Sequence, residues 1–436
     1  MQSGSRKGLC RILIGLAFAV GALPPGTAQL LGPEFQINTY ETNYQQRPDL
    51  AFDGSGAFVV VWNSTAQDGS DLGVYGQRFD ASGIPAGTEF QINSYTTGIQ
   101  AKPMVAAAGA GAFVVVWAGD NQDGSTYGIF GQRFDAAGQP LGNEFQVNSF
   151  TTGVQRAPAV AVDGLGNFVV VWTSDSEDGA SWGVFGQRFS SSGTPQGNEF
   201  QVNSYTTAIQ WVPAVTADAS GDFVVVWPSY GQDGIGWGVF GQRFNSAGTP
   251  QGNEFQVNSY TTGDQLYPRV ATNSTGDFVV VWSSAPQDGS SDGIFGQRFA
   301  SSGLPQGNEF QVNTYTSGSQ SRPAVAADTA GSFAVTWSSN LQDGSFGGIF
   351  GRRFGSTGGP LGNDFQINAF TTGGQQNPAV AAASSGDFVV AWDSFHDGYL
   401  TGVFGRRMAV VLFAGDFELG DVCAWSAAVG GGACPP

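Results

Sequence analysis

The 436-residue chain is poor in the residues that nucleic-acid-binding proteins and most catalytic sites need. It contains one histidine and three cysteines, and its 17 Lys and Arg face 35 Asp and Glu, which gives a formal net charge of −18. A protein that binds a phosphate backbone needs clustered positive charge, so this balance excludes nucleic acid as a partner. The same excess of acid is unsuited to an anionic membrane surface.

Long hydrophobic runs are also missing, apart from one near the N-terminus. There, Arg6, Lys7 and Arg11 precede an apolar run over 12–23 and a small-residue exit that ends at Ala28. The run is too short to span a bilayer and has the pattern of a cleaved secretory signal. We therefore expect residues 1–28 to be a signal peptide, no membrane span elsewhere, and a secreted or extracellular protein associated with the cell surface.

Removal of the signal peptide would leave two of the three cysteines, Cys423 and Cys434, in a Gly-rich C-terminal segment. An even pair in an exported protein favours one local disulfide between them. A two-ligand metal site is the alternative, but neither a histidine nor a third cysteine lies nearby in the sequence.

The composition that remains is typical of a turn-rich globular protein. Glycine occurs 66 times and aromatic residues make up 13% of the chain. Charged residues make up 12%, about half the usual share. Such a chain can bury a large apolar area.

A repeat of 55 residues organises the sequence. Its most regular marker is a tryptophan that recurs without drift, at Trp62, Trp117, Trp172, Trp227, Trp282, Trp337 and Trp392. Phenylalanines from Phe35 to Phe365, prolines from Pro48 to Pro378 and glutamines from Gln45 to Gln375 follow the same step. Only the seventh copy shows a deletion, of one residue between Trp392 and Asp397. Each copy is therefore one structural unit.

Each unit contains four strand-like runs separated by Gly, Asp and Pro clusters, and no helical period. In the third copy we expect these strands at 158–162, 167–172, 183–189 and 198–203. The second strand is apolar on both faces, so other sheets must cover both. The first strand consists of small residues that suit a crowded axis, whereas the fourth alternates and is half exposed.

These patterns predict an all-β fold, a seven-bladed β-propeller with four antiparallel strands per blade over residues 29–413. The chain begins with a lone fourth strand over 34–38 and ends with a unit that lacks one, at 378–407. The N-terminal strand should therefore join the last three strands and remove an exposed sheet edge. Residues 414–436 form a Gly-rich tail with the expected disulfide. A linear array of separate sheets is the alternative, and the complementary ends argue against it.

The motifs also carry two resemblances. The segments G-N-E-F-Q-V-N-S-Y-T-T-G and Q-D-G-S-x-x-G-I-F-G-Q-R-F resemble repeats of this length in large exported bacterial surface proteins, over roughly residues 32–410. Such repeats often accompany calcium-binding glycine-rich or cadherin-like modules, and the resemblance implies no established catalytic activity. The tail from Gly415 to Ser426 resembles a D-G-F-E-x-G-D-x-x-x-W-S segment at the C-termini of exported bacterial proteins, with Gly and Asp exchanged at 415–416.

The two longer connections of each unit should project from the same side of the propeller, called here the long-loop face. In the third copy they are the loop between the second and third strands, 174–182, and the link from the fourth strand to the next unit, 203–210. Functional residues concentrate on such loops. The recurring Gln from Gln45 to Gln375 should satisfy buried backbone groups there.

Seven aspartates, each followed by glycine, recur in the loops between second and third strands: Asp68, Asp123, Asp178, Asp233, Asp288, Asp343 and Asp397. Each loop offers a single Asp of this kind, whereas calcium loops gather several oxygen ligands. We expect Asp-Gly turns, no metal site and no cofactor, with calcium as the weaker alternative.

A second ring of charges concerns the third and fourth strands. Arginines on the third strand, such as Arg188 and Arg243, recur beside acids on the fourth, such as Glu199 and Glu254. Opposite charges on neighbouring strands predict cross-strand ion pairs.

No catalytic residue is identified. His396 is the only histidine and lies in the one shortened loop, but the sequence supplies no nucleophile or acid–base partner for it. Three acids break the repeat pattern, Asp175, Glu177 and Asp393, and none has an evident partner. Paired carboxylates of the glycosidase type would have to come from such positions.

Additional aromatic residues break the repeat on the long-loop face. Tyr127, Trp182 and Trp237 share one repeat position on blades two, three and four, and Trp211 and Tyr267 lie in the links that enter blades four and five. These five residues are the candidate ligand-binding residues. Loop-against-loop packing is the alternative, since an exposed aromatic patch marks an interaction site only if it is accessible.

The sequence therefore favours an exported, non-catalytic propeller that acts as a monomer and binds a neutral glycan or an extracellular protein. Aromatic rings suit a sugar, and the acidic surface favours a neutral one. Asp178, Gln210, Asp233 and Gln232 are the neighbouring candidates for hydroxyl contacts. An exported glycoside hydrolase or lyase on the same fold is the second reading, and a structural spacer is the third.

Overall fold

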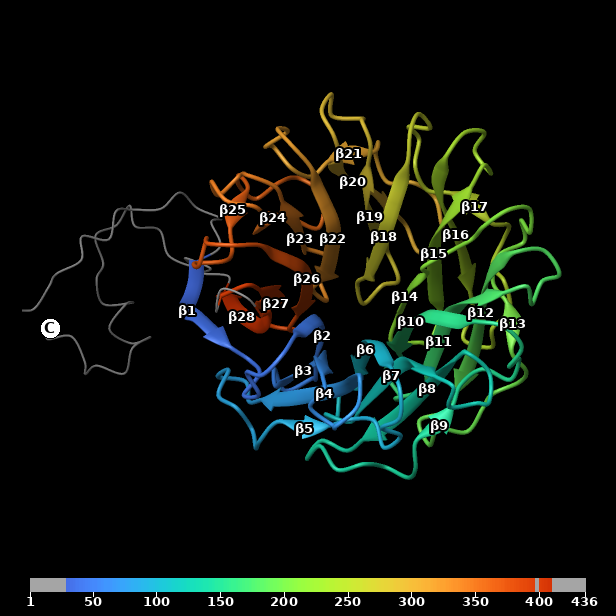
Figure 1. The fold of residues 1–436 in the computed structure, drawn as a ribbon. Coiled ribbons are helices and arrows are strands. Elements are labelled where there is room, and N and C mark those ends of the chain that lie inside the picture. The colour runs from blue at the N-terminus through green and yellow to red at the C-terminus, as the bar shows by residue number, and fades with distance from the viewer. Residues whose placement is uncertain (1–28, 397–399, 410–436) are drawn as a thin grey trace, which may run out of the picture. The chain divides into compact units, whose positions relative to one another are not determined.

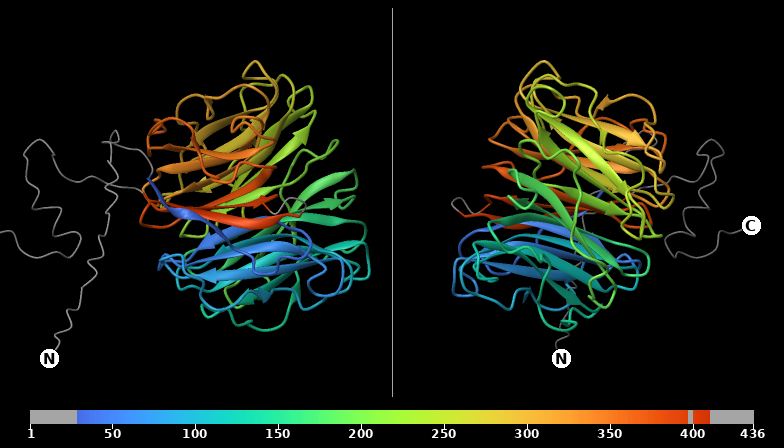
Figure 2. Two further views of the ribbon diagram at one scale, coloured as in Figure 1. Left: turned by 60° about the vertical axis from the view of Figure 1, so that its left-hand side comes forward. Right: turned by 90° about the vertical axis from the view of Figure 1, so that its right-hand side faces the viewer.

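The computed structural model describes residues 29–396 and 400–409. Within these residues the chain forms 28 strands and no helix, arranged as seven four-stranded antiparallel sheets around an axis (Figure 1). Two side views show neighbouring sheets packed face against face (Figure 2). The seven-bladed β-propeller predicted from the repeat is confirmed.

In blades one to six the strands follow chain order from the axis outward, and blade seven differs only in its outermost strand, which is β1. The first strands of blades one to seven are β2 (Gln45–Phe52), β6 (Gln100–Ala107), β10 (Gln155–Val162), β14 (Ala214–Ala217), β18 (Gln265–Thr272), β22 (Gln320–Ala327) and β26 (Gln375–Ala382). The second strands are β3 (Phe58–Thr65), β7 (Phe113–Asp120), β11 (Phe168–Asp175), β15 (Phe223–Tyr230), β19 (Phe278–Ser284), β23 (Phe333–Ser339) and β27 (Phe388–Ser394).

The outer half of each blade follows the same order. The third strands are β4 (Leu72–Phe79), β8 (Tyr127–Phe134), β12 (Trp182–Phe189), β16 (Trp237–Phe244), β20 (Gly293–Phe299), β24 (Gly348–Phe354) and β28 (Gly402–Ala409). The fourth strands are β5 (Phe90–Gln91), β9 (Phe145–Gln146), β13 (Phe200–Gln201), β17 (Phe255–Gln256), β21 (Phe310–Gln311), β25 (Phe365–Gln366) and, for blade seven, β1 (Gln29–Gln36).

The cores lie between blades, as the two apolar faces of the second strands require. In blade three, Val170 and Trp172 pack toward blade two, whereas Val169 and Val171 pack toward blade four. All seven repeat tryptophans are fully buried. Burial of apolar surface on both faces of every second strand holds each blade against its two neighbours.

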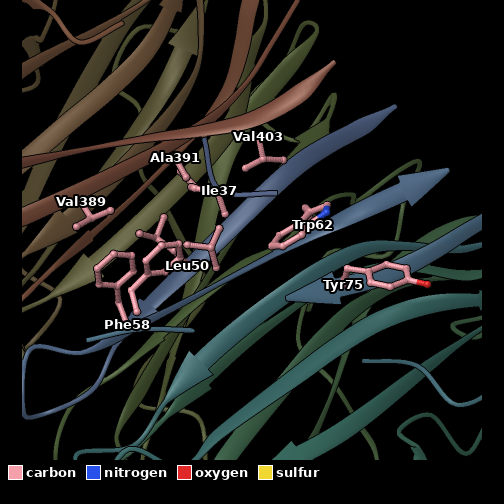
Figure 3. Packing of buried hydrophobic residues seen from close by; sticks show 11 residues of the cluster. Ile37, Leu50, Phe58, Trp62, Tyr75, Val389, Ala391 and Val403 are labelled. Carbon is pink, nitrogen blue, oxygen red and sulfur yellow. The ribbon is translucent and has the colours of Figure 1, made fainter. Parts of the chain in front are cut away.

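The ring closes as predicted. β1 pairs antiparallel with β28, so the order in blade seven is β1-β28-β27-β26. Figure 3 shows the core at this junction, which joins side chains of blade seven to those of blade one: Ile37, Val389, Ala391 and Val403 with Leu50, Phe58, Trp62 and Tyr75. The first and last segments of the propeller are thus one blade.

The strands of blade three differ from their predicted bounds by one to three residues at one end or both, and two of these differences have clear local reasons. In blade three the first strand begins at Gln155 rather than Pro158, because pairing continues upstream of a bulge between Arg156 and Ala159. The fourth strand is shorter than predicted because the Asn203 side chain, rather than a backbone group, accepts the next hydrogen bond, from the backbone N–H of Val184 at 2.7 Å.

Several sequence predictions fall outside the described residues. They are the signal peptide over 1–28, the Asp397 loop position, the tail over 414–436 and the Cys423–Cys434 disulfide. In the part of the chain that the structure describes, no helix is long and apolar enough to cross a membrane.

Candidate ligand-binding site

The structure places the long connections on one face. The link from blade two to blade three runs beside the start of the third strand of blade two, through a parallel bridge between Tyr127 and Val154. The N–H of Asp175, at the end of β11 in blade three, donates to the carbonyl of the same Val154. A link and the loops of both blades that it joins therefore lie together, which confirms the expected long-loop face.

Three candidate aromatics occupy equivalent positions on this face. Tyr127, Trp182 and Trp237 each begin a third strand, opposite the last residue of the second strand: Asp120, Asp175 and Tyr230. The common repeat position predicted from the sequence is therefore a common position in three successive blades.

The tryptophans of blades three and four are joined into one row by an arginine. The Cζ of Arg156 lies 4.2 Å from the ring centroid of Trp182 and 4.9 Å from that of Trp211. The ring centroids of Trp211 and Trp237 are 6.4 Å apart, and Tyr230 packs edge-on against Trp237 at 5.3 Å. These five residues, Tyr230, Trp237, Trp211, Arg156 and Trp182, are called the Trp–Arg row. Cation–π contacts of this geometry contribute about 0.5–2 kcal/mol.

The sequence explains why Trp211 leaves the regular sheet. In other blades the residue after the recurring Gln pairs with the residue after the repeat Trp, as Arg156 does with Thr173. In blade four that partner is Pro228, which has no N–H to donate, so only the bond from the N–H of Trp211 to the carbonyl of Pro228 remains. The first strand accordingly begins only at Ala214.

The row is partly exposed and contains unpaired donors. Trp182, Trp211 and Trp237 are half-buried, and Tyr230 is 48% exposed. The Nε1 of Trp211 and the Nε of Arg156 are buried without a hydrogen-bond partner among the described residues. The indole nitrogens of the seven repeat tryptophans are unpaired in the same way, so these two buried donors do not by themselves mark a ligand site.

Tyr127 and Tyr267 relate differently to the row. Burial and the charge of Asp120 raise the pKa of Tyr127, and the positive charge of Arg156 opposes them, so Tyr127 lies within electrostatic range of the row. Tyr267 is 42% exposed and makes no aromatic contact within the described residues. The structure thus brings together three of the five predicted site residues, Trp182, Trp211 and Trp237, and extends them toward Tyr127.

Sequence reasoning missed two members of the row, Arg156 and Tyr230. Arg156 occupies the same repeat position as Trp211, directly after the recurring Gln, and Tyr230 is the cross-strand partner of Trp237. Aligning those two repeat positions would have revealed both.

Two of the polar residues expected to contact sugar hydroxyls, Gln210 and Gln232, make hydrogen bonds within the loops instead. Gln210 is fully buried, where its side chain accepts from Asn203 at 3.2 Å and donates to the carbonyl of Thr207 at 3.0 Å. Gln232 donates to Glu254. The expectation of hydroxyl contacts from these two glutamines is therefore wrong, because each completes the loop structure.

The seven recurring glutamines form a structural ring. Each of these glutamines lies next to a buried Asn of the preceding link. In blade two, for example, the side-chain oxygen of Gln100 accepts from the side-chain amide of Asn93 at 3.1 Å. The side-chain oxygen of Asn93 in turn accepts from the N–H of Val74 on the third strand of blade one at 2.8 Å. The predicted role in satisfying loop backbone groups is confirmed.

The described Asp-Gly loops are turns. The Oδ1 of Asp68 accepts from the N–H of Ser70 at 3.1 Å. The same bond, from the backbone N–H two residues after the Asp, is made by Asp123, Asp178, Asp288 and Asp343. A Cβ added at Gly73 would lie 2.7 Å from Asp68 Oδ2, so a glycine is needed where the carboxylate folds back. Within 29–396 and 400–409, no group of three or more His, Cys, Asp or Glu is arranged as a metal site.

The prediction of ion pairs between third-strand arginines and fourth-strand acids is wrong. Arg78 of blade one donates instead to the backbone carbonyl of Ala137 in blade two. Arg188, Arg243 and Arg298 likewise donate to a backbone carbonyl of the blade that follows their own. The acids bind backbone of the preceding blade. Only Arg352 and Asp364 approach as a pair, at 3.9 Å, within the described residues. The charges therefore tie blades together rather than strands.

His396 and Glu177 both replace a glutamine that contacts the fourth-strand acid. In blade one, Gln67 donates to Glu89 at 2.6 Å. In blade seven, His396 Nδ1 lies 3.7 Å from Glu34, with the imidazole between Phe370 and Phe404. In blade three, Glu177 takes this place near Glu199, and burial together with the neighbouring carboxyl group raises the pKa of Glu177 to about 9.

Comparisons with known proteins show the fold. No protein-family model matches the chain, and no curated protein matches its sequence. A protein of unknown function from Dyadobacter fermentans has a TM-score of 0.53 at 10% identity, covering 88% of this chain and 99% of its own. The α-L-arabinanase of Penicillium chrysogenum, solved with arabinobiose, gives 0.49 at 13% identity over 88% and 99%. The NanB sialidase of Streptococcus pneumoniae gives 0.47 at 9% over 86% and 70%.

Proposed function

We propose that this protein is an exported, non-catalytic propeller that binds carbohydrate along the Trp–Arg row. The observation that carries the proposal is the row itself: Tyr230, Trp237, Trp211, Arg156 and Trp182 line up across blades three and four on the long-loop face. Half-exposed aromatic rings with polar edges suit a sugar, which has an apolar face and hydroxyl groups at its rim.

The row combines aromatic rings with a charged side chain, which suits a polar ligand rather than a purely apolar one. The guanidinium of Arg156, which carries five N–H donors, lies over the rings of Trp182 and Trp211. The adjacent Ile235 is 78% exposed and widens the apolar part of the surface. Export rests on the signal-peptide pattern of residues 1–28.

The acids that break the repeat support binding over glycoside hydrolysis. Glycosidase carboxyl groups stand about 5–9.5 Å apart, with room for a sugar or a water between them. Glu177 replaces the Gln that contacts the fourth-strand acid in blade one, and Glu199 accepts from the backbone N–H of Ser149, so both belong to the junction between blades. Asp393 accepts from the N–H of Arg47 at 3.3 Å and from the side chain of Asn377 at 3.2 Å.

A glycan array probed with residues 29–436 tests the proposal. We expect defined oligosaccharides to bind, Trp237→Ala to lose most of the signal, and Phe346→Ala to keep it. Phe346 is a matched control because it is 81% exposed on a long loop of blade six, outside the row. Melting curves of all three proteins should coincide.

Two results would overturn the proposal. One is that no glycan binds the parent at millimolar concentration, or that folded Trp237→Ala binds as well as the parent. The other is release of new reducing ends from a bound glycan, which would favour the hydrolase reading. Trp237→Phe keeps an aromatic ring and serves if the alanine variant does not fold.

A further inference from the structure

The positive charges of the propeller are confined to two places. Nine of the 14 basic residues in the described part of the chain lie on third strands. The remaining five lie within the first five residues of first strands: Arg47, Lys102, Arg156, Arg269 and Arg322. The first strands form the inner edge of every sheet, and each contacts the next around the axis (Figure 1). Five cations are thus gathered at the axial end of the long-loop face.

The backbone at this place is held in an unusual conformation. The second residue after each recurring Gln has a left-handed φ of 44° to 56°, at Arg47, Lys102, Ala157, Val212, Tyr267, Arg322 and Asn377. Strained backbone positions of this kind often cluster at ligand sites. Side chains of the preceding blade hold three of them by their N–H groups, as Asn63 holds Lys102 at 3.0 Å and Thr173 holds Val212 at 3.0 Å.

These cations have no carboxylate partner. Within the described residues none of the five lies within ion-pair distance of an Asp or Glu, although acids outnumber bases in the chain. Arg322 donates to the side chain of Asn377, and Arg269 donates to the carbonyl of Pro268 at 3.0 Å. Three carboxylates nevertheless lie within electrostatic range: Asp49 of Arg269, Asp175 of Arg156 and Asp393 of Arg322. The five charges are therefore held near one another with only partial neutralisation.

The acids nearest the axis are bound to backbone. Asp49 accepts from the N–H of Val105 at 2.8 Å, and burial raises its pKa to about 6. Burial, together with the like charges of Arg47, Arg156 and Arg269, lowers the pKa of Lys102 to about 8. Mutual repulsion of this kind is relieved when an anion binds among the cations.

We infer that the axial end of the long-loop face binds a carboxylate, so that the ligand of the Trp–Arg row is an acidic sugar such as a uronate oligosaccharide. This inference rests on the proposed function and names its ligand class. Arg156 belongs to both places, since it stacks on two tryptophans of the row and is one of the five axial cations. One sugar would stack on the row while the carboxylate of its neighbour meets Arg47 and Lys102. The expectation of a neutral glycan followed from the charge of the whole chain, which does not describe this part of the surface.

Titration calorimetry with two matched probes tests the inference: α-1,4-linked trigalacturonate and neutral α-1,4-linked galactotriose. The test variant is Arg47→Met with Lys102→Met, and the charge-matched control is Arg78→Met with Arg298→Met on the third strands. We expect the acidic trisaccharide to bind the parent at least tenfold more tightly than the neutral one. The test variant should lose that preference, and the control should keep it.

The outcomes separate the two proposals. Equal affinities for both trisaccharides, unchanged in the test variant, would overturn the carboxylate inference and leave carbohydrate binding intact. If neither trisaccharide binds, the anion site is tested separately, by comparing the melting temperatures of the parent and of the test variant in citrate and in chloride at equal ionic strength. A rise in melting temperature in the parent but not in the test variant supports an anion site, because an anion bound only by the native state stabilises it. The same rise in both proteins overturns it.

Discussion

The carboxylate of Glu34 on β1 accepts a hydrogen bond from the backbone N–H of Ala369 at 2.6 Å, and the two residues are 335 positions apart in the sequence. The same contact joins Glu89 to Thr39, and Glu144, Glu199, Glu254, Glu309 and Asp364 repeat it at the remaining junctions. Because β1 is the outermost strand of blade seven, the bond of Glu34 joins blades six and seven, and the same bond occurs at all seven junctions of the ring.

Deletion of residues 29–40 should prevent stable folding. It removes β1 and Glu34 and leaves the edge of β28 unpaired, and such an edge promotes aggregation. Size-exclusion chromatography and thermal melting followed by circular dichroism measure the effect. A soluble deletion variant that melts cooperatively at the temperature of the parent would contradict closure by β1.

A milder test compares Glu34→Gln with Glu309→Gln, the equivalent change inside the chain. Both remove a charged acceptor from two or more donors, and we expect each to lower the free energy of unfolding by about 1–3 kcal/mol. Equal losses support equivalent junctions. A loss confined to Glu309→Gln would show that the bond made by Glu34 of β1 contributes little.

Glu177 should make the stability of blade three depend on pH. Its pKa is raised by burial and by Glu199, so the protonated form is favoured in the folded state. The stabilisation is complete below the ordinary pKa of a glutamic acid and is lost as the pH rises through about 9. Glu177→Gln restores the Gln–Glu bond of the other blades, and its stability advantage over the parent should grow from pH 5 to pH 9.

The reverse substitution is the control for this effect. Gln232→Glu places the same acid pair in blade four, beside Glu254, and should introduce the same loss of stability at high pH. Urea unfolding at several pH values measures both variants. Parallel pH curves for the parent and Glu177→Gln would show that Glu177 and Glu199 do not share a proton.

Chelation should leave the fold unchanged. In five of the six described Asp-Gly loops the carboxylate accepts a hydrogen bond within its own turn, as Asp68 does from the N–H of Ser70. We expect the melting temperature of metal-loaded and EDTA-treated protein to agree within a few degrees. A decrease of more than about 10 °C on chelation would show a stabilising bound metal.

The fold was predictable because its determinants are repeated. The spacing from Trp62 to Trp392 fixed the number of blades, and the lone N-terminal strand matched the strand missing from the last unit. The exchange of charges between blades was not predictable in this way. Arg78 and Glu89 lie on neighbouring strands, yet their partners, Ala137 and Thr39, belong to different blades.

The candidate site was predictable only in part. The repeat position shared by Tyr127, Trp182 and Trp237 identified the face and the blades. The role of Arg156 depends on the packing of blade three against blade four, which brings Trp211 to the other side of its guanidinium. A count of aromatic residues does not contain that information.

The most direct test of carbohydrate binding is a calorimetric titration of the strongest array ligand into the parent, Trp182→Ala and Phe346→Ala. Trp182 ends the row and stacks on Arg156, so its removal takes away one ring without disturbing the blade core. We expect Trp182→Ala to weaken binding by about 1–3 kcal/mol, as removal of a binding hot spot does, and Phe346→Ala to leave the dissociation constant unchanged. Equal dissociation constants for the parent and a fully folded Trp182→Ala would contradict the account.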